Sequence, residues 1–157
     1  MPELRDIDEA AKEHAGLSRK VLDYSIEMKR MVEAAKQPGF AEASWAGLSG
    51  YVNVEKFIRV GNFKEVMTWA DYVAFLTPWA MHSEWEGSFK RVTESGSLVI
   101  LELEERSRVG GHSSVVNSVS VYEFGDDGRI EHLDIYLQMP MPDPEMLAGY
   151  AGIEISG

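Results

Sequence analysis

Cysteine is absent from this chain of 157 residues. Its absence excludes disulfides, thiolate nucleophiles and zinc clusters of the cysteine type. Long apolar runs are also absent, since none approaches the roughly 20 residues that a membrane-spanning helix needs. The opening stretch, MPELRDIDEAAKEH, alternates in charge and has no apolar core, which is not typical of a signal peptide. We therefore expect a cytoplasmic protein that does not enter a membrane.

Basic residues are scarce beside acidic ones. Lys and Arg total 15 against 26 Asp and Glu, so the net charge is −11. Such a surface repels phosphate backbones, and we expect no nucleic-acid partner. The sequence contains no G-x-S-x-G and no phosphate-binding loop, which disfavours a serine hydrolase or a nucleotide enzyme. The histidines show no metal-ligand spacing, and we expect neither a metal nor a cofactor.

The overall composition is that of an ordinary globular protein. Hydrophobic residues make up 45% and charged residues 26%, unlike a disordered chain. The length suffices for one domain with a real core. We expect a single domain over residues 1–157. The stretch after Gln138 carries three of the six prolines, which predicts a C-terminal tail over 141–157 with a short helix at Pro144–Tyr150.

Three long antiparallel strands are predicted in the second half of the chain, at Ser97–Val109, His112–Phe124 and Arg129–Gln138. Gly110-Gly111 and the turn at Gly125–Gly128 separate these runs of β-branched residues, and both are strong hairpin signals. Side chains on a strand alternate between two faces. The face that is turned inward therefore decides which residues form a site.

Helical spacing dominates the first half of the chain. It predicts helices at Leu17–Lys36, Phe40–Leu48 and Lys64–His82. Strands are predicted at Tyr51–Gly61 and Ser88–Glu94, and residues 1–16 are either a frayed lead-in or the start of the first helix. Because helices precede the antiparallel meander, we expect an α+β fold in which N-terminal helices pack on one face of a curved antiparallel sheet.

Three segments resemble the nuclear transport factor 2-like superfamily. VYEFGDDGRIEHLDIYLQ is similar to its closing strands, YVNVEKFIRVGN to its short strand after the second helix, and WAGLSGY to the helix before that strand. The superfamily includes SnoaL-like polyketide cyclases, ketosteroid isomerase, limonene epoxide hydrolase and scytalone dehydratase. The resemblance covers roughly residues 17–140. It implies a cone-shaped fold enclosing a pocket, and a homodimer formed through the outer sheet face.

The resemblance also implies a strand register. Pointing inward are Val99, Leu101, Leu103 and Glu105 on the first meander strand, Val116, Ser118, Ser120 and Tyr122 on the second, and Leu133, Ile135 and Leu137 on the third. The residues partly support this register, because the chosen face of the third strand is wholly apolar. A slip of one residue would instead turn Asp134 and Tyr136 inward.

Glu105 is the first catalytic candidate. In this register it is a carboxylate on an otherwise apolar face, which suits a general acid or base. By resemblance it corresponds to the acidic residue of the hydrolase's catalytic trio. The alternative is a solvated glutamate at the end of the strand, beside the hairpin.

Arg59 is the second catalytic candidate. By resemblance it occupies the position of the isomerase's catalytic base, but an arginine stays protonated and cannot act as a base. It could bind a carboxylate or enolate oxygen, or pair with Glu105. The alternative is a rim residue whose stem packs while its head reaches water.

The sequence departs from the family at three positions. Ile135 stands where the cyclases and the hydrolase carry an aspartate, Ser120 where the isomerase has its oxyanion-hole aspartate, and Leu103 where the hydrolase has an arginine. The mechanisms of these relatives therefore cannot run unchanged here. Ser118 and Ser120 remain as inward hydrogen-bond donors.

Aromatic residues complete the expected pocket. Tyr24, Trp45, Phe57, Trp69 and Trp79 surround the cone, mostly as core, and some present a flat apolar wall to a ligand. His82 lies in the sequence between Trp79 and Trp85, and either lines the pocket mouth or is a surface histidine at a helix end. With Val116, Leu133, Ile135 and Leu137, these residues are the predicted substrate-binding set.

Three functions fit this sequence. The first is a cofactor-independent enzyme, an isomerase, dehydratase, cyclase or epoxide hydrolase, acting on a small apolar polyketide-, steroid- or terpenoid-like molecule by acid/base chemistry. The second is a non-catalytic ligand binder or accessory protein of the same fold, which the missing aspartates favour. The third is a dimeric interaction module. A pair between Arg59 and Glu105 would favour the first.

Overall fold

The computed structural model describes residues 3–141, 144, 148, 151 and 152. The elements, in chain order, are β1 (Arg5–Asp6), α1 (Ile7–Lys12), α2 (Gly16–Ala34), the 3₁₀ helix η1 (Glu42–Gly50), β2 (Ile58–Val60), β3 (Val66–Thr68), α3 (Trp69–His82), β4 (Ser83–Ser95), β5 (Leu98–Val109), β6 (His112–Phe124) and β7 (Ile130–Gln138). Most of the tail expected over 141–157, including five of the seven residues of the helix expected at Pro144–Tyr150, lies outside the described residues.

The seven strands form one curved sheet in the order β1-β4-β5-β6-β7-β2-β3. The strands from β4 to β7 are an antiparallel meander, and the α+β class is as predicted. The curved sheet is mixed and not antiparallel at every pairing, because β2 runs parallel to β7. Hairpin turns set the direction of neighbours in sequence, whereas no turn links β2 to β7.

The strand register agrees with the predicted one. Leu101 of β5 lies opposite Ser120 of β6, which lies opposite Ile135 of β7. Inward positions on these strands, such as Val99 and Leu133, are fully buried. In the alternative register Asp134 and Tyr136 would point inward, but the Asp134 carboxylate is 2.9 Å from His132 Nε2 on the outer face and Tyr136 is 59% exposed.

The segment around β2 and β3 differs from the prediction. The strand expected over Tyr51–Gly61 is reduced to β2, and the helix expected from Lys64 begins only at Trp69, after β3 has paired with β2. A capping box explains this start. The Thr68 hydroxyl accepts the Asp71 N–H at 3.2 Å, and the Asp71 carboxylate accepts the Thr68 N–H at 3.0 Å.

The N-terminus forms elements that the sequence did not predict. β1 pairs with the edge of β4, and α1 is a separate short helix whose first turn is capped by Asp6. The following helix, α2, begins at Gly16, close to its predicted start. β4 is also longer than expected and extends back to Ser83, directly after α3.

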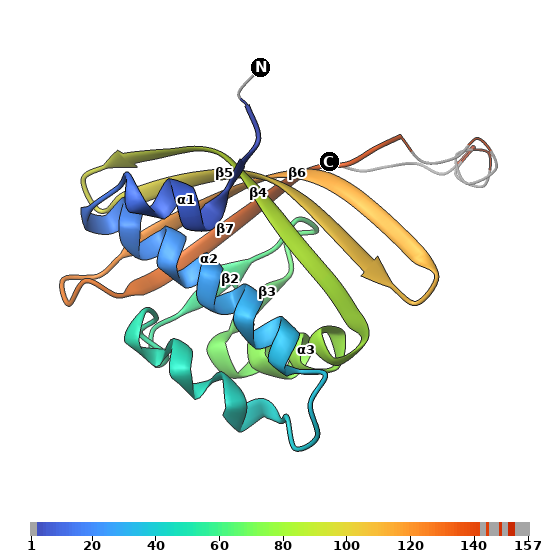
Figure 1. Ribbon diagram of the computed structural model, residues 1–157, viewed down its shortest axis with the longest axis horizontal. Helices are drawn as coiled ribbons and strands as arrows, with labels where there is room; N and C mark the ends of the chain where they lie inside the picture. Colours follow the sequence, from blue (N-terminus) through green and yellow to red (C-terminus); the bar gives the residue numbers. More distant parts are fainter. Residues whose placement is uncertain (1–2, 142–143, 145–147, 149–150, 153–157) are drawn as a thin grey trace.

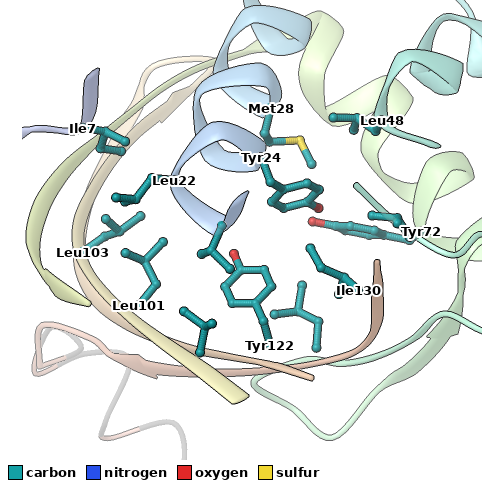
Figure 2. Close-up of a cluster of buried hydrophobic side chains, with 14 of the residues drawn as sticks. Ile7, Leu22, Tyr24, Met28, Leu48, Tyr72, Leu101, Leu103, Tyr122 and Ile130 are labelled. Atoms are coloured by element: carbon teal, nitrogen blue, oxygen red, sulfur yellow. The ribbon is translucent and has the colours of Figure 1, made fainter. Parts of the chain in front are cut away.

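The helices cover one face of the sheet, with α2 running diagonally across it and η1 and α3 beside one another below (Figure 1). Leu22 of α2 and Leu101 of β5 are among the fully buried side chains of this layer. Figure 2 shows the sheet curving around this cluster. In the part of the chain that the structure describes, no helix has the length and apolarity required to cross a membrane.

Candidate functional site

A cavity of about 310 Å³ lies between the concave face of the sheet and helices α2 and α3. Its wall is mainly apolar, with Met28, Leu76, Leu103, Leu133, Ile135 and Leu137 among the lining residues. The polar lining comprises Arg59, Glu105, three tyrosines and several serines. A mostly apolar pocket with a few convergent polar groups is the usual form of a small-molecule site.

The two charged residues of the cavity belong to opposite ends of it. Arg59 is level with Leu133 of β7 and Tyr122 of β6, whereas Glu105 is level with Val116 of β6. Between Val116 and Tyr122 a strand advances by about 20 Å, at roughly 3.3 Å per residue. From these separated backbone positions the two side chains make no hydrogen bond or ion pair with each other, so the pair considered between Arg59 and Glu105 is not formed.

Arg59 pairs instead with the hairpin that joins β2 to β3. Its Nη1 lies 3.3 Å from Glu65 Oε1, and the guanidinium carbon lies 4.9 Å from the centre of the Tyr72 ring. Only 12% of the Arg59 side chain is exposed. The buried Nε has no hydrogen-bond partner among the described residues. Glu65 is therefore the one carboxylate among the described residues that pairs with this guanidinium, and the Arg59 Nε is left free to donate to a ligand.

Three tyrosines contribute buried hydroxyls to the cavity. Tyr24 comes from α2, Tyr72 from α3 and Tyr122 from β6, and the rings of Tyr24 and Tyr122 meet edge-on with centroids 5.9 Å apart. Figure 2 shows the hydroxyls of Tyr24 and Tyr72 pointing toward one another. Burial is the main cause that raises the pKa of all three above the usual tyrosine range. Each is therefore a neutral hydroxyl that can donate a hydrogen bond at neutral pH.

Glu105 is held by a tryptophan from the neighbouring strand. The Trp85 indole N–H donates to Glu105 Oε1 at 2.7 Å, while Oε2 has no hydrogen-bond partner in the described part of the chain. Gly87 lies directly opposite Glu105 on β4. A Cβ atom at Gly87 would lie only 3.4 Å from Trp85 Cζ2, so the missing side chain lets the indole reach across to Glu105.

Nine of the predicted site residues line this cavity. They are Arg59, Glu105, Tyr24, Trp79, Val116, Ser120, Leu133, Ile135 and Leu137. They come from α2, α3 and four strands, and the alternating face of β6 and β7 brings most of them together. The structure shows that these residues line the cavity, and their catalytic or binding roles are predictions.

The other five predicted site residues do not line the cavity. Trp45 of η1 is buried, and its indole N–H donates to Thr77 Oγ1 of α3 at 3.0 Å. Phe57 is 1% exposed and packs edge-on against Trp69, with ring centroids 5.4 Å apart. Trp45 and Phe57 are fully buried in the core and Trp69 is partly buried against it, so these aromatic residues pack behind the cavity wall.

His82 and Ser118 are also corrections. His82 is exposed at the C-terminal end of α3, where the chain turns into β4. Ser118 points inward as predicted, but it is 2% exposed and lies between Leu103 and Leu137 of the neighbouring strands. The larger side chains cover its hydroxyl, which has no partner among the described residues.

Sequence reasoning missed several polar residues of the cavity as site candidates, Tyr72 and Trp85 among them. Tyr72, Leu76 and Trp79 lie at helical spacing and all line the cavity, so the pattern contained a usable signal. Trp85 lies two residues before Gly87, in a stretch with charged neighbours that was not predicted as strand. Only the pairing of β4 with β5 places its indole beside Glu105.

No protein-family model and no curated protein matches the sequence. Solved structures match in fold. A protein of Shewanella putrefaciens CN-32, assigned to the SnoaL-like polyketide cyclases, is 12% identical with a TM-score of 0.63 over 98% of each chain. An NTF2-like protein of Cytophaga hutchinsonii is 14% identical with a TM-score of 0.51, over 86% of this chain and 96% of its own.

A third similar structure is an LEH-like epoxide hydrolase of M. tuberculosis. It is 17% identical with a TM-score of 0.52, over 69% of this chain and 80% of its own. At these identities the similarity shows the fold alone. The chain has the nuclear transport factor 2-like fold that the sequence resemblance predicts, and its chemistry must be argued from its own residues.

Proposed function

We propose that this protein is a cofactor-independent enzyme that acts on a small, mostly apolar molecule by acid/base chemistry at Glu105. One observation carries the proposal. The Glu105 carboxylate lies on an apolar cavity wall with one oxygen held by Trp85, at 2.7 Å, and the other oxygen turned to no partner among the described residues. A fixed carboxylate with one available oxygen is what a general base needs.

The residues have distinct roles in the proposed reaction. Glu105 Oε2 takes a proton from a carbon of the bound molecule, and the electron pair left on that carbon moves toward an adjacent oxygen. A neutral tyrosine hydroxyl, from Tyr72 or Tyr122, donates a hydrogen bond to that oxygen as negative charge develops on it. Glu105 then returns the proton to another carbon, which is an isomerisation, or the electron pair expels a hydroxyl group from the neighbouring carbon, and that group takes the proton from Glu105 and leaves as water, which is a dehydration.

The similar structures support the small-molecule part of this proposal. Two of them carry the names of a polyketide cyclase-like protein and an epoxide hydrolase. We extend this to polyketide-, steroid- or terpenoid-like substrates for the present chain, because the cavity is apolar and of a size for such a ring system. An isomerase, dehydratase or cyclase activity is proposed.

A second candidate function is a non-catalytic binder of the same kind of molecule. Ile135 favours it, because this inward position on β7 lines the cavity with an aliphatic side chain where the resembled cyclases carry an aspartate. A cavity with one carboxylate can bind a ligand without turning it over. The two functions make opposite predictions for Glu105.

Proton exchange with solvent separates the two functions. The protein would be incubated in D₂O with a panel of cyclic ketones, enones and epoxides, and deuterium incorporation and product formation followed by NMR and mass spectrometry. We expect Glu105→Gln to lower the rate by about 10²-fold or more, with ligand binding retained. The matched control is Glu104→Gln, on the same strand but paired with Arg106 on the outer face.

Each result has a definite meaning. Equal turnover by the wild-type protein and the Glu105→Gln variant would remove Glu105 from the mechanism. Ligand binding without exchange on any member of the panel would favour the binder.

We also propose a homodimer that forms through the outer sheet face. That face carries Glu102, Glu104, Asn117, Val119, Val121, Asp134, Tyr136 and Gln138. Polar, aliphatic and aromatic groups are mixed there, as in non-obligate interfaces.

A further inference from the structure

The buried guanidinium of Arg59 has two edges with different environments. The Nη1 edge contacts Glu65 Oε1 at 3.3 Å, on the side of the β2–β3 hairpin. On the opposite edge, Nε is buried and has no hydrogen-bond partner, and no described residue accepts from Nη2. Nε and Nη2 are the parallel pair of donors that matches the two oxygens of a carboxylate.

A second unpartnered donor belongs to the same end of the cavity. The Tyr24 hydroxyl is buried without a hydrogen-bond partner among the described residues, in a residue that is 3% exposed. It points toward the hydroxyl of Tyr72 (Figure 2), and the guanidinium carbon of Arg59 lies 4.9 Å from the centre of the Tyr72 ring. Buried donors without acceptors are rare in folded proteins, so the buried Nε of Arg59 points to a missing acceptor, and the Tyr24 hydroxyl is a further donor at the same end.

The donors at the Arg59 end of the cavity fit one kind of ligand acceptor better than the others. Arg59 is the one cationic side chain among the described residues that line the cavity, which is too little positive charge for a phosphate in an apolar pocket. A ketone oxygen has two lone pairs, so it would leave at least one of the three donors, Nε, Nη2 and the Tyr24 hydroxyl, without a partner. A carboxylate accepts two N–H groups from one guanidinium edge and has lone pairs left for a hydroxyl.

We propose that the cavity binds an apolar molecule carrying a carboxylate, which sits on the Nε–Nη2 edge of Arg59 with the Tyr24 hydroxyl as a further donor. The proposed carboxylate site names the substrate class of the proposed function. It rests on one part of that function, namely that the cavity binds a small apolar molecule. The carboxylate is bound at the end away from Glu105, so the like charges are kept apart. The apolar body of the ligand then runs toward Glu105, where the reacting carbon lies.

Matched probes test this inference without a known substrate. Cyclohexanecarboxylate, cyclohexanecarboxamide and cyclohexyl methyl ketone have the same ring and differ in the polar group. Binding would be measured by isothermal titration and by quenching of tryptophan fluorescence, since Trp79 and Trp85 line the cavity. We expect the carboxylate to bind at least about tenfold more tightly than the amide or ketone.

Two variants identify the donors. Arg59→Met should abolish the preference for the carboxylate and leave binding of the ketone, because it keeps an unbranched apolar stem and removes the guanidinium fork. Tyr24→Phe should reduce the preference several-fold with the fold intact, which covers the case in which Arg59→Met does not fold. Glu65→Gln is the control, because it alters the other edge of the guanidinium and should preserve the preference.

These binding experiments can fail independently of the proton-exchange experiment that tests the catalytic role of Glu105. A wild-type protein that binds the amide or the ketone as tightly as the carboxylate, or binds none of the three, overturns the inference. So does a preference that survives in both Arg59→Met and Tyr24→Phe. If Glu105→Gln retains both the preference and full proton exchange, the carboxylate site stands and the catalytic role of Glu105 falls.

Discussion

The indole of Trp85 donates a hydrogen bond to Glu105 across two neighbouring strands, with 2.7 Å between Nε1 and Oε1. The two residues are not directly opposite each other, since Trp85 pairs with Ser107 and Glu105 with Gly87. The diagonal contact exists because Gly87 has no side chain between them. One oxygen of the candidate catalytic carboxylate is therefore held by a rigid aromatic group.

Replacing Trp85 by Phe should slow the proposed reaction. The ring is kept but the N–H is lost, so the carboxylate is no longer held in one orientation. A hydrogen bond to a charged group contributes about 1.5–3 kcal/mol, and we expect a loss of at least about tenfold in kcat with a smaller change in KM. Trp79→Phe is the control, since Trp79 lines the same cavity without a hydrogen bond to Glu105. Equal effects of the two changes would show that Trp85 only fills space.

Replacing Gly87 by Ala should destabilise the protein and displace the indole. The added Cβ would lie 3.2 Å from Ile7 Cδ1 and 3.4 Å from both Leu103 Cδ1 and Trp85 Cζ2. Overpacking of this kind costs about 1–3 kcal/mol, measured by urea unfolding. Gly50→Ala is the matched control, because nothing lies within 4 Å of a Cβ at that position. A Gly87→Ala variant as stable as Gly50→Ala would contradict the tight contact.

Alkaline pH should destabilise the protein through its buried tyrosines. Burial raises the pKa of Tyr24, Tyr72 and Tyr122 in the folded state, while an unfolded tyrosine titrates near pH 10. Their contribution to stability is therefore fully present below about pH 10 and declines as the pH rises toward the folded-state pKa values. Near-ultraviolet absorbance should show these three ionising only as the protein unfolds. Their titration in the native protein alongside Tyr136, which is 59% exposed, would be inconsistent with this.

Acid should weaken the attachment of helix α2 to the sheet. The helix has no side-chain cap of its own at Ala15, and Glu94 of β4 accepts both the N–H and the hydroxyl of Ser18, at 2.7 and 2.8 Å. These bonds, the backbone one first, lower the pKa of Glu94 below its usual value. The stability they provide is present above the unfolded pKa, near 4.3, and is lost as the pH falls through the lowered folded-state pKa.

Glu94→Gln should therefore unfold with less dependence on pH below about 4.3 than the wild-type protein. Thermal unfolding across acid pH measures this difference. Glu55→Gln is the control, because no described residue donates a hydrogen bond to the Glu55 side chain. A pH dependence unchanged in Glu94→Gln would mean that other carboxylates control the acid transition.

Sedimentation tests the proposed dimer. We expect the wild-type chain to sediment as a dimer at micromolar concentration and Tyr136→Arg to sediment as a monomer, because the substitution places a charge on the outer face of β7. Met81→Arg, which also changes an exposed apolar residue (43% exposed) but on helix α3, on the other side of the sheet, should stay dimeric. A monomeric wild-type protein at this concentration would refute the dimer.

Local signals in the sequence were enough for the meander and for most of the cavity wall. The two hairpin turns set the pairing of β5, β6 and β7, and the apolar face of β7 set which side points inward. Because alternate positions on a strand share a face, these signals together with the family resemblance place Glu105, Ser120 and Ile135 on the concave side. The strand β6 has the bounds that the sequence predicts, His112–Phe124.

Contacts between distant segments decided the rest. No local pattern specifies that β2 runs parallel to β7, that Arg59 pairs with Glu65 rather than Glu105, or that Trp45 and Phe57 lie behind the wall instead of in it. The helical spacing of Tyr72 indicated a face of α3, but not that this face meets Tyr24 of α2. Hydrophobic periodicity indicates which side of a helix or strand is buried. The residue that this side contacts across the core depends on how the separate elements pack. That packing brings the donors of Arg59 and Tyr24 into one cavity.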